Sequence, residues 1–243
     1  MPHESLRIIR EEHAALSVML RSLAALVERG PGEPQADYFT ALRAIFFCID
    51  EFHEAQHHSK ESEWLFPKVA ASSQEAADAV RLLDQDHATS EASVRYLQHL
   101  LHAWEMIGSI RRATFESACH AYIAHLSEHM ALEERLILPQ AERSLSAEDW
   151  QQLDDAFARC GDASVSTYLA DPDYASLLAR IGRLVGPPSV QKSRLLTEQL
   201  FPEGVILLGL SAQNSLSRFL AKHELRLLPT PFCRKAVFCF SVR

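Results

Sequence analysis

The sequence predicts an all-α fold: an up-down four-helix bundle made of two αα-hairpin repeats, followed by short C-terminal helices and an irregular tail. Two histidine and carboxylate segments recur 72 positions apart, apolar residues recur at helical spacing ahead of both, and breaker residues separate the resulting helices. Each repeat consists of one helix with a candidate histidine, a short connection, and one helix with a histidine and glutamate pair. Two such hairpins make a four-helix bundle.

Breaker and capping residues delimit the expected helices. A cluster of glycine and proline at residues 30–32 ends the first helix, the serines at 72–73 are N-cap candidates for the third, and Gly108 precedes the fourth. The ranges that we expect for the four long helices are residues 5–27, 36–70, 74–107 and 110–143. Two shorter helices are expected to follow, over residues 144–158 with Ser146 as N-cap, and between residues 171 and 186.

Both segments carry the motif His-x3-His-x3-Glu, with a proline six residues further on. The motif residues are His53, His57, Glu61 and Pro67 in the first segment, and His125, His129, Glu133 and Pro139 in the second. Residues four apart lie on one face of an α-helix, roughly 6 Å along its axis, so a histidine and the glutamate after it can reach one point in space. The preceding helix of each repeat carries one further candidate histidine, His13 in the first and His87 in the second.

The motif face of the second helix continues its apolar face, so the histidines and the glutamate are expected to point inward. The apolar stripe that leads into the motif at helical spacing is Tyr38, Leu42, Ile45, Ile49 and Phe52. Buried histidine and carboxylate pairs are costly without partners, which favours a bound cation. A mixed set of imidazole and carboxylate ligands suits iron, manganese or zinc, and the absence of Cys-x2-Cys spacing argues against a structural zinc or iron–sulfur site.

A ferritin-like di-iron site is the main alternative for a helical bundle. It needs a Glu-x-x-His motif on two helices. Glu54 and His57 fit that form on the second helix, but the fourth helix has no matching pair. The pattern therefore favours a histidine-rich centre.

The motifs resemble those of the hemerythrin-like proteins, the family of the HHE cation-binding domain. The resemblance rests on Glu12-His13, on Asp86-His87, and on residues 57–67 and 129–142, and it covers residues 1–145. It implies a non-haem di-iron centre with two iron ions inside the bundle. The carboxylates that it implies as bridges are Glu61 and Glu133, and the histidines that it implies as terminal ligands are His13, His57, His87 and His129.

The oxygen-carrying members of that family use five histidines, and the resemblance assigns four here. His53 or His125, one turn before His57 and His129, could supply a fifth ligand, or water could take the position; otherwise both line the cavity next to the ligands. Four further histidines are expected at the surface or in ordinary packing: His58, His99, His102 and His120.

Composition and charge narrow the class of protein. Residues 1–188 hold 29 acidic and 16 basic side chains, whereas residues 189–243 hold 3 and 8. An acidic bundle without a basic stripe argues against nucleic-acid binding. No apolar run is long enough to span a bilayer and no export signal is visible, so we expect a cytoplasmic protein without membrane attachment. The five cysteines are scattered, which does not support a disulfide framework, and Cys48 and Cys119 are expected in the core.

Three units are expected along the chain. Residues 1–145 form the hemerythrin-like bundle, residues 146–188 form a helical extension, and residues 189–243 form an irregular basic tail that is poorly ordered or loosely attached. The break at Gly186-Pro187-Pro188 and the reversal of charge set the tail apart. We favour read-through or a shifted reading frame as its origin over a partner-binding or membrane-surface segment.

Three functions fit the sequence. The first is a di-iron module that binds or senses O2 or NO, or buffers iron. The second is a di-iron enzyme with peroxidase, oxidase or iron-centre repair activity, for which peroxide is a further small ligand. The third is a bundle whose metal is stored or structural. We favour a binding protein over an enzyme, because no flavin, nicotinamide or iron–sulfur motif is present as a source of electrons.

Overall fold

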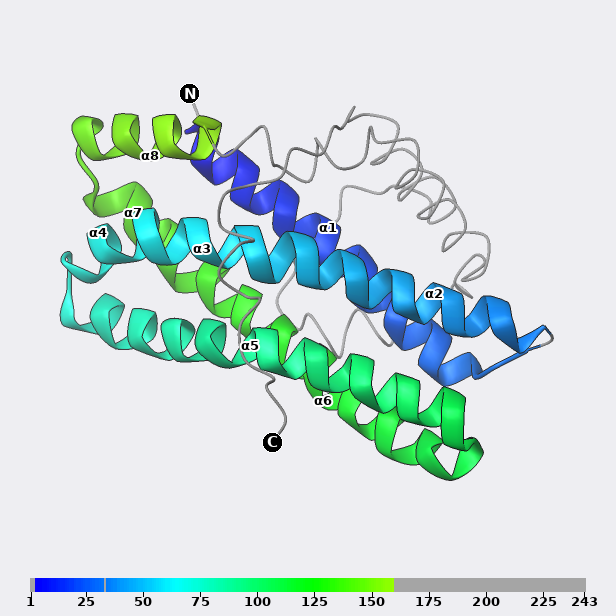
Figure 1. Ribbon diagram of the computed structural model, residues 1–243. Helices are drawn as coiled ribbons and strands as arrows, with labels where there is room; N and C mark the ends of the chain where they lie inside the picture. The colour runs from blue at the N-terminus through cyan, green and yellow to red at the C-terminus, as the bar shows by residue number, and fades with distance from the viewer. Residues whose placement is uncertain (1–2, 33, 160–243) are drawn as a thin grey trace, which may run out of the picture.

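The computed structural model describes residues 3–32 and 34–159, and the described chain is all-helical, as expected. The long helices form four rods, each either one helix or several helical segments in direct succession. Figure 1 shows these rods running side by side. The helix expected between residues 171 and 186, the boundary at residue 188 and the tail at 189–243 lie outside the described residues.

The first and third rods are single α-helices, α1 (Glu4–Arg29) and α5 (Gln74–Ile107). Gly30 ends α1 with φ of 69°, a conformation that favours glycine, and its N–H donates to the carbonyl of Leu26. Ser73 caps α5, because its hydroxyl oxygen accepts a hydrogen bond from the backbone N–H of Ala76 at 3.1 Å. Gly108 follows α5 with φ of 102°. The capping and breaker residues recognised in the sequence therefore delimit both rods.

The second and fourth rods are continuous but not uniform. The second consists of α2 (Gln35–Cys48), η1 (Ile49–His57), α3 (His58–Lys60), η2 (Glu61–Leu65) and α4 (Phe66–Ala70). After a short 3-10 turn, η3 (Ser109–Arg111), the fourth consists of α6 (Arg112–Leu132), η4 (Glu133–Ile137) and α7 (Leu138–Ser144). The outer limits of both rods agree with the expected ranges.

The segments η1, η2 and η4 have π-helical geometry, which the sequence analysis did not predict. In a π turn the hydrogen bonds run to the fifth residue, so the backbone widens locally. Pro67 and Pro139 each follow such a segment by two residues and lack the N–H that an α-helical ladder would use. Glu61 and Glu133 are the first residues of η2 and η4, so both glutamates lie where the rods widen.

Each rod packs against the rod before it and the rod after it in the chain, and rod 4 also packs against rod 1. Rod 1 packs against rods 2 and 4, and rod 3 packs against rods 2 and 4. Short connections join α1 to α2 at one end, α4 to α5 at the other, and α5 to α6 at the first end again (Figure 1). Successive rods therefore run in opposite directions.

Helix α8 (Ala147–Arg159) packs against the start of α1. Ser146 is its N-cap, as expected: its hydroxyl donates to Asp149 at 2.7 Å and accepts from the Asp149 backbone N–H at 3.2 Å. Asp154 in turn accepts the backbone N–H of Ser5 at 2.8 Å, which satisfies a free donor at the start of α1. The buried side chains of α8 are Trp150, Leu153, Ala156 and Phe157.

Two clusters of buried apolar side chains pack between the rods, one towards each end. The first lies towards the α1–α2 connection and includes Leu23, Ile45, Trp104 and Phe115, and it also contains Cys48 and Cys119, as expected. The second lies towards α8 and includes Leu6, Phe66, Leu138 and Phe157. Along the rods, the buried side chains of His13, His57, Glu61 and Glu133 fall between residues of the first cluster and residues of the second. A layer of polar side chains is thus enclosed by apolar packing on both sides.

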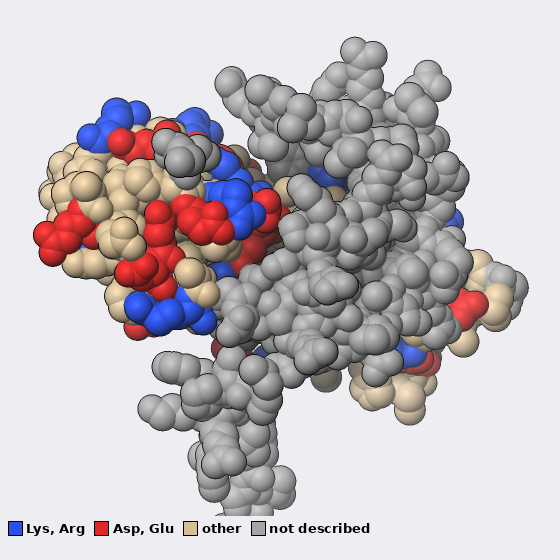
Figure 2. All heavy atoms as spheres, turned by 90° about the horizontal axis from the view of Figure 1, so that it is seen from above, with Lys and Arg blue, Asp and Glu red and all other residues tan. Residues whose placement is uncertain are grey.

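Charged side chains of both signs stand next to one another on the described surface that is visible in Figure 2. Several of them pair across or along the helices, among them Arg10 with Glu142 at 3.0 Å and Lys68 with Asp149 at 2.7 Å. Within residues 3–32 and 34–159, no helix combines the length and the apolar character that a membrane span requires.

Candidate metal centre

Six side chains from all four rods meet between the apolar clusters. They are His13, His57, Glu61, His87, His129 and Glu133, and we call them the polar layer. The Nε2 atoms of His13 and His57 lie 3.2 Å apart, and those of His87 and His129 lie 3.1 Å apart. The six residues implied by the family resemblance are therefore brought together, and their four histidines form two pairs.

The carboxylates of Glu61 and Glu133 lie between the histidine pairs. Nε2 of His57 is 3.3 Å from Glu61, and Nε2 of His13 and His129 are 3.1 and 3.2 Å from Glu133. Nε2 of His87 is 3.8 Å from Glu61 and 3.9 Å from Glu133. Each glutamate thus faces histidines of both pairs, which is the position that a bridging carboxylate needs.

Both glutamates are fully buried, and none of their four oxygens has a hydrogen-bond partner among the described residues. A buried carboxylate without hydrogen bonds loses its hydration, and nearby imidazoles restore only part of that loss. Cations held between the carboxylates and the Nε2 atoms would offset that loss. The donor set of imidazole nitrogens and carboxylate oxygens fits iron, manganese or zinc.

Every histidine of the polar layer is held at its other ring nitrogen. Nδ1 of His13 lies 3.0 Å from Glu134, and Nδ1 of His87 lies 2.9 Å from Ser62. Nδ1 of His57 lies 2.8 Å from Glu12, and Nδ1 of His129 lies 3.3 Å from Asp86. An Nδ1–H that donates to these oxygens leaves Nε2 with its lone pair directed at the centre, which is the tautomer that binds a metal.

Ser62 fits the same pattern because its hydroxyl proton is already engaged. Its Oγ donates to Asp84 at 2.9 Å, so the oxygen is left to accept from Nδ1 of His87. The partner residues were not identified from the sequence. Glu12 and Asp86 precede His13 and His87, but each holds a histidine on a different rod, so helical spacing carries no signal of the pairing.

Glu12 is itself held by a buried cation. Its Oε1 accepts a hydrogen bond from the ammonium of Lys60, and both side chains are buried. Burial by itself raises the pKa of Glu12, but the charge of Lys60 and the hydrogen bond from His57 outweigh it and lower the pKa to about 2. Glu12 is therefore ionised and can accept the Nδ1 proton of His57.

The metal-free centre holds protons. Burial lowers the pKa of His13, but the carboxylates of Glu133, 3.1 Å from Nε2, and Glu134, 3.0 Å from Nδ1, outweigh it and raise the pKa to about 10. Burial and the neighbouring charge of Glu133 raise the pKa of Glu61 above its usual range. Positive charge on His129 and His13 lowers the pKa of Glu133 against the effect of burial. These shifts favour protonation of His13 and Glu61 in the metal-free centre.

The two additional ligand candidates, His53 and His125, lie in different environments. His53 is buried, stacks on His57 with ring centroids 4.8 Å apart, and leaves Nε2 without a partner among the described residues. Its donor atom groups with Glu54 and His58. The side chain of His125 is 42% exposed, and its Nε2 lies 3.6 Å from Asp86. His125 therefore stands outside the polar layer.

His58 was expected either at the surface or in ordinary packing, and the surface position is wrong. Its side chain is 5% exposed, its ring stacks on His87 with centroids 3.8 Å apart, and its Nε2 has no hydrogen-bond partner among the described residues. His58 is displaced by one residue from the His-x3-Glu spacing, so the helical pattern did not predict that it lies beside the ligands. Its position directly after His57 was the available signal.

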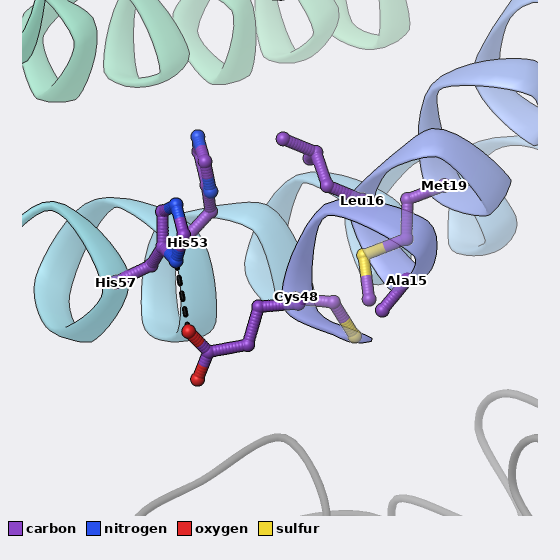
Figure 3. Close-up of a pocket in the computed structure, with 7 residues that line it drawn as sticks. Ala15, Leu16, Met19, Cys48, His53 and His57 are labelled. Carbon is purple, nitrogen blue, oxygen red and sulfur yellow. Dashed lines mark hydrogen bonds and ion pairs between the residues drawn. The ribbon is translucent and has the colours of Figure 1, made fainter. Parts of the chain in front are cut away.

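A small pocket adjoins the polar layer beside His57, with room for about one water-sized molecule (Figure 3). In the close-up His53 and His57 project from the same helix, and the dashed line marks the hydrogen bond between His57 and Glu12. The residues that line the pocket are Glu12, Ala15, Leu16, Met19, Cys48, His53 and His57. One side of the pocket is therefore apolar and the other carries imidazole.

The family model of the hemerythrin HHE cation binding domain matches residues 4–141. This match covers more than half of the 243 residues, so the chain belongs to the hemerythrin HHE cation-binding family. No curated protein and no solved structure matches the chain. Cation binding by histidine and glutamate is the function that this family membership and the polar layer together indicate.

Proposed function

We propose that this protein is a non-haem di-iron protein that binds a small diatomic ligand, O2 or NO, reversibly. The residues that would hold the two iron ions are Glu61 and Glu133, as shared carboxylates, and His13, His57, His87 and His129, as terminal ligands. The observation that carries the proposal is the pair of buried carboxylates without hydrogen-bond partners, flanked by four Nε2 atoms at 3.1–3.9 Å. Such a set of donors is costly to bury unless cations compensate it.

We propose further that the rods form an up-down four-helix bundle, to which α8 (Ala147–Arg159) adds a helical extension. The alternation of rod directions and the contacts of each rod with two neighbours support this architecture. The bundle holds the polar layer rigidly, because every ligand stands on a long helix that is anchored by apolar side chains on both sides.

The chain supplies orientation, charge balance and exclusion of water. Glu12, Asp86 and Glu134 fix three imidazole rings and hold their Nδ1 protons, while the apolar clusters keep bulk water from the centre. Bound iron would supply the redox-active site and an open coordination position for O2 or NO. The pocket of Ala15, Leu16, Met19 and Cys48 offers an apolar space of suitable size beside His57.

The histidine content of the layer favours binding over sustained oxidation of a substrate. Four histidines and two carboxylates make a site that is poorer in negative charge than a carboxylate-rich one. The pocket is too small for an organic substrate, which a small-molecule enzyme site would have to enclose. A di-iron enzyme that turns over peroxide needs no such enclosure and is the second candidate.

Optical spectra of the reduced, iron-loaded protein test the proposal. We expect absorption bands that appear on exposure to O2 or NO and disappear when the gas is removed, through several cycles. Catalytic loss of added peroxide would favour the enzyme. A loaded centre that responds to none of the three would point to stored or structural metal. Iron-loaded protein in which Glu61→Gln has removed a bridging carboxylate is the control.

A further inference from the structure

We infer that His58 is a fifth histidine ligand of the centre and that Glu54 holds it in place for that role. This inference rests on the proposed metal site and assigns a residue that the six-ligand set leaves out. His58 is buried beside the polar layer, yet its Nε2 has no hydrogen-bond partner among residues 3–32 and 34–159. A buried imidazole nitrogen without a partner is costly, and a cation would compensate it.

His58 belongs to one side of the layer. The donor atoms of His58, His87 and His129 lie within 4.8 Å of one another. Its ring centroid is 3.8 Å from that of His87 and 5.5 Å from that of His129, whereas the ring of His57, its neighbour in sequence, is 5.9 Å away. The ring therefore lies between His53, whose centroid is 4.2 Å away, and the second histidine pair, although its backbone follows His57.

The other ring nitrogen of His58 faces a carboxylate, as in most histidines of the layer. Nδ1 lies 3.2 Å from Oε2 of Glu54, at the distance but not with the alignment of a hydrogen bond. Oε1 of Glu54 accepts hydrogen bonds from Ser90 at 2.7 Å and from Tyr122 at 3.0 Å. Glu54 is thus fixed by two other rods and can position His58 with Nε2 free for a metal.

The internal repeat isolates this pair. His57 and Glu61 correspond to His129 and Glu133, but the positions that correspond to His58 and Glu54 are Met130 and Leu126, which are apolar and buried. The polar pair therefore has no counterpart in the second repeat. It gives the centre three histidines on the side of His87 and His129, and two on the side of His57 and His13, next to the pocket.

Cobalt(II) loading of the full-length chain tests the inference, with His58→Ala compared with His53→Ala. His53 is the matched control because it is equally buried one turn away but falls outside the group with His87 and His129. We expect His58→Ala to weaken one of two cobalt sites by about 100-fold or more, and His53→Ala to change affinity by no more than about 10-fold. Competition with a chelator measures both constants.

A second variant gives a signal that appears instead of one that is lost. In His58→Cys, a thiolate that binds cobalt produces an intense sulfur-to-cobalt charge-transfer band, which we do not expect in His53→Cys or in wild type. The band also serves if His58→Ala folds poorly. Two cobalt ions in wild type, with unchanged affinity in His58→Ala and no new band in His58→Cys, would overturn the role of His58 alone. Wild type that binds no cobalt and no iron would overturn the metal site itself.

Discussion

Each histidine of the polar layer is oriented by an oxygen from the preceding rod in cyclic order. His57 of rod 2 is held by Glu12 of rod 1, and His129 of rod 4 by Asp86 of rod 3. His87 of rod 3 is held by Ser62 of rod 2, and His13 of rod 1 by Glu134 of rod 4. Each pair therefore ties two neighbouring rods together at the level of the centre.

At the residue scale, spacing within one helix was enough to predict part of the layer. His57 with Glu61, and His129 with Glu133, follow from positions four apart, and their inward direction follows from the apolar stripe. The Nδ1 partners and the packing of His58 could not be predicted in this way. They depend on which residues of neighbouring rods stand at the same height, and helical period carries no such information.

Metal binding should release protons. Because the pKa of His13 is raised to about 10, this histidine is protonated at pH 7 in the metal-free protein, and a metal must displace that proton. Affinity should therefore rise with pH between 6 and 8. Calorimetric titration in two buffers with different ionisation enthalpies would count the protons, and we expect at least one per chain. Zero release, with an affinity independent of pH, would contradict the protonation of the centre.

The buried pair of Glu12 and Lys60 predicts an asymmetric mutational response. Glu12→Ala leaves the Lys60 ammonium buried without its anion and should lower the free energy of unfolding of the metal-free protein by about 3–5 kcal/mol. Replacing both residues, as Glu12→Leu with Lys60→Met, should recover most of that loss because no charge stays buried alone. Urea unfolding measures both variants. A loss of less than about 1 kcal/mol for Glu12→Ala would refute this account.

At the element scale, the helix limits follow from local chemistry and the π-helical segments do not. Ser73, Gly30 and Ser146 act through their own caps or turns, so their effects are visible in the sequence. The wide turns η1, η2 and η4 depend on how the rods accommodate Pro67 and Pro139 while they bury the glutamates. A π-helical segment of five residues, such as η2 or η4, is too short to change the spacing of an apolar stripe recognisably.

The attachment of α8 should depend on pH through Asp149. Hydrogen bonds from Lys68 and Ser146 lower the pKa of Asp149 to about 2, below its usual 3.8. The ionised carboxylate therefore contributes stability above pH 3.8, and that contribution disappears as the pH falls through 2. Asp149→Asn should unfold more easily than wild type at pH 7 and equally easily near pH 2. Asp155→Asn, an exposed site on the same helix, is the control, and an equal effect at both sites would exclude the cap.

At the scale of the whole molecule, the two apolar clusters explain why a polar layer can exist between the four rods. The cluster of Leu23 and Trp104 closes one side, and that of Leu6 and Phe157 closes the other. The second cluster takes part of its side chains from α8, which lies beyond the expected boundary at residue 145. The extension is therefore expected to stabilise the bundle.

Two truncations separate the extension from the tail. Ending the chain after Pro188 should leave metal content and melting temperature unchanged, because the tail at 189–243 is expected to add nothing to the functional unit. Ending it after residue 145 should lower the melting temperature, because Trp150, Leu153 and Phe157 leave the second cluster. Loss of metal or of thermal stability on the first truncation would show that the tail belongs to the bundle.

Iron content per chain tests the central claim most directly. Glu61→Gln removes one buried bridging charge without changing the size of the side chain, whereas Glu63→Gln makes the same change at an exposed position two residues away. Elemental analysis after anaerobic iron loading should give two iron ions per chain for wild type and for Glu63→Gln, and fewer than two for Glu61→Gln. Wild type without iron, or equal iron in all three proteins, would contradict a di-iron centre at the polar layer.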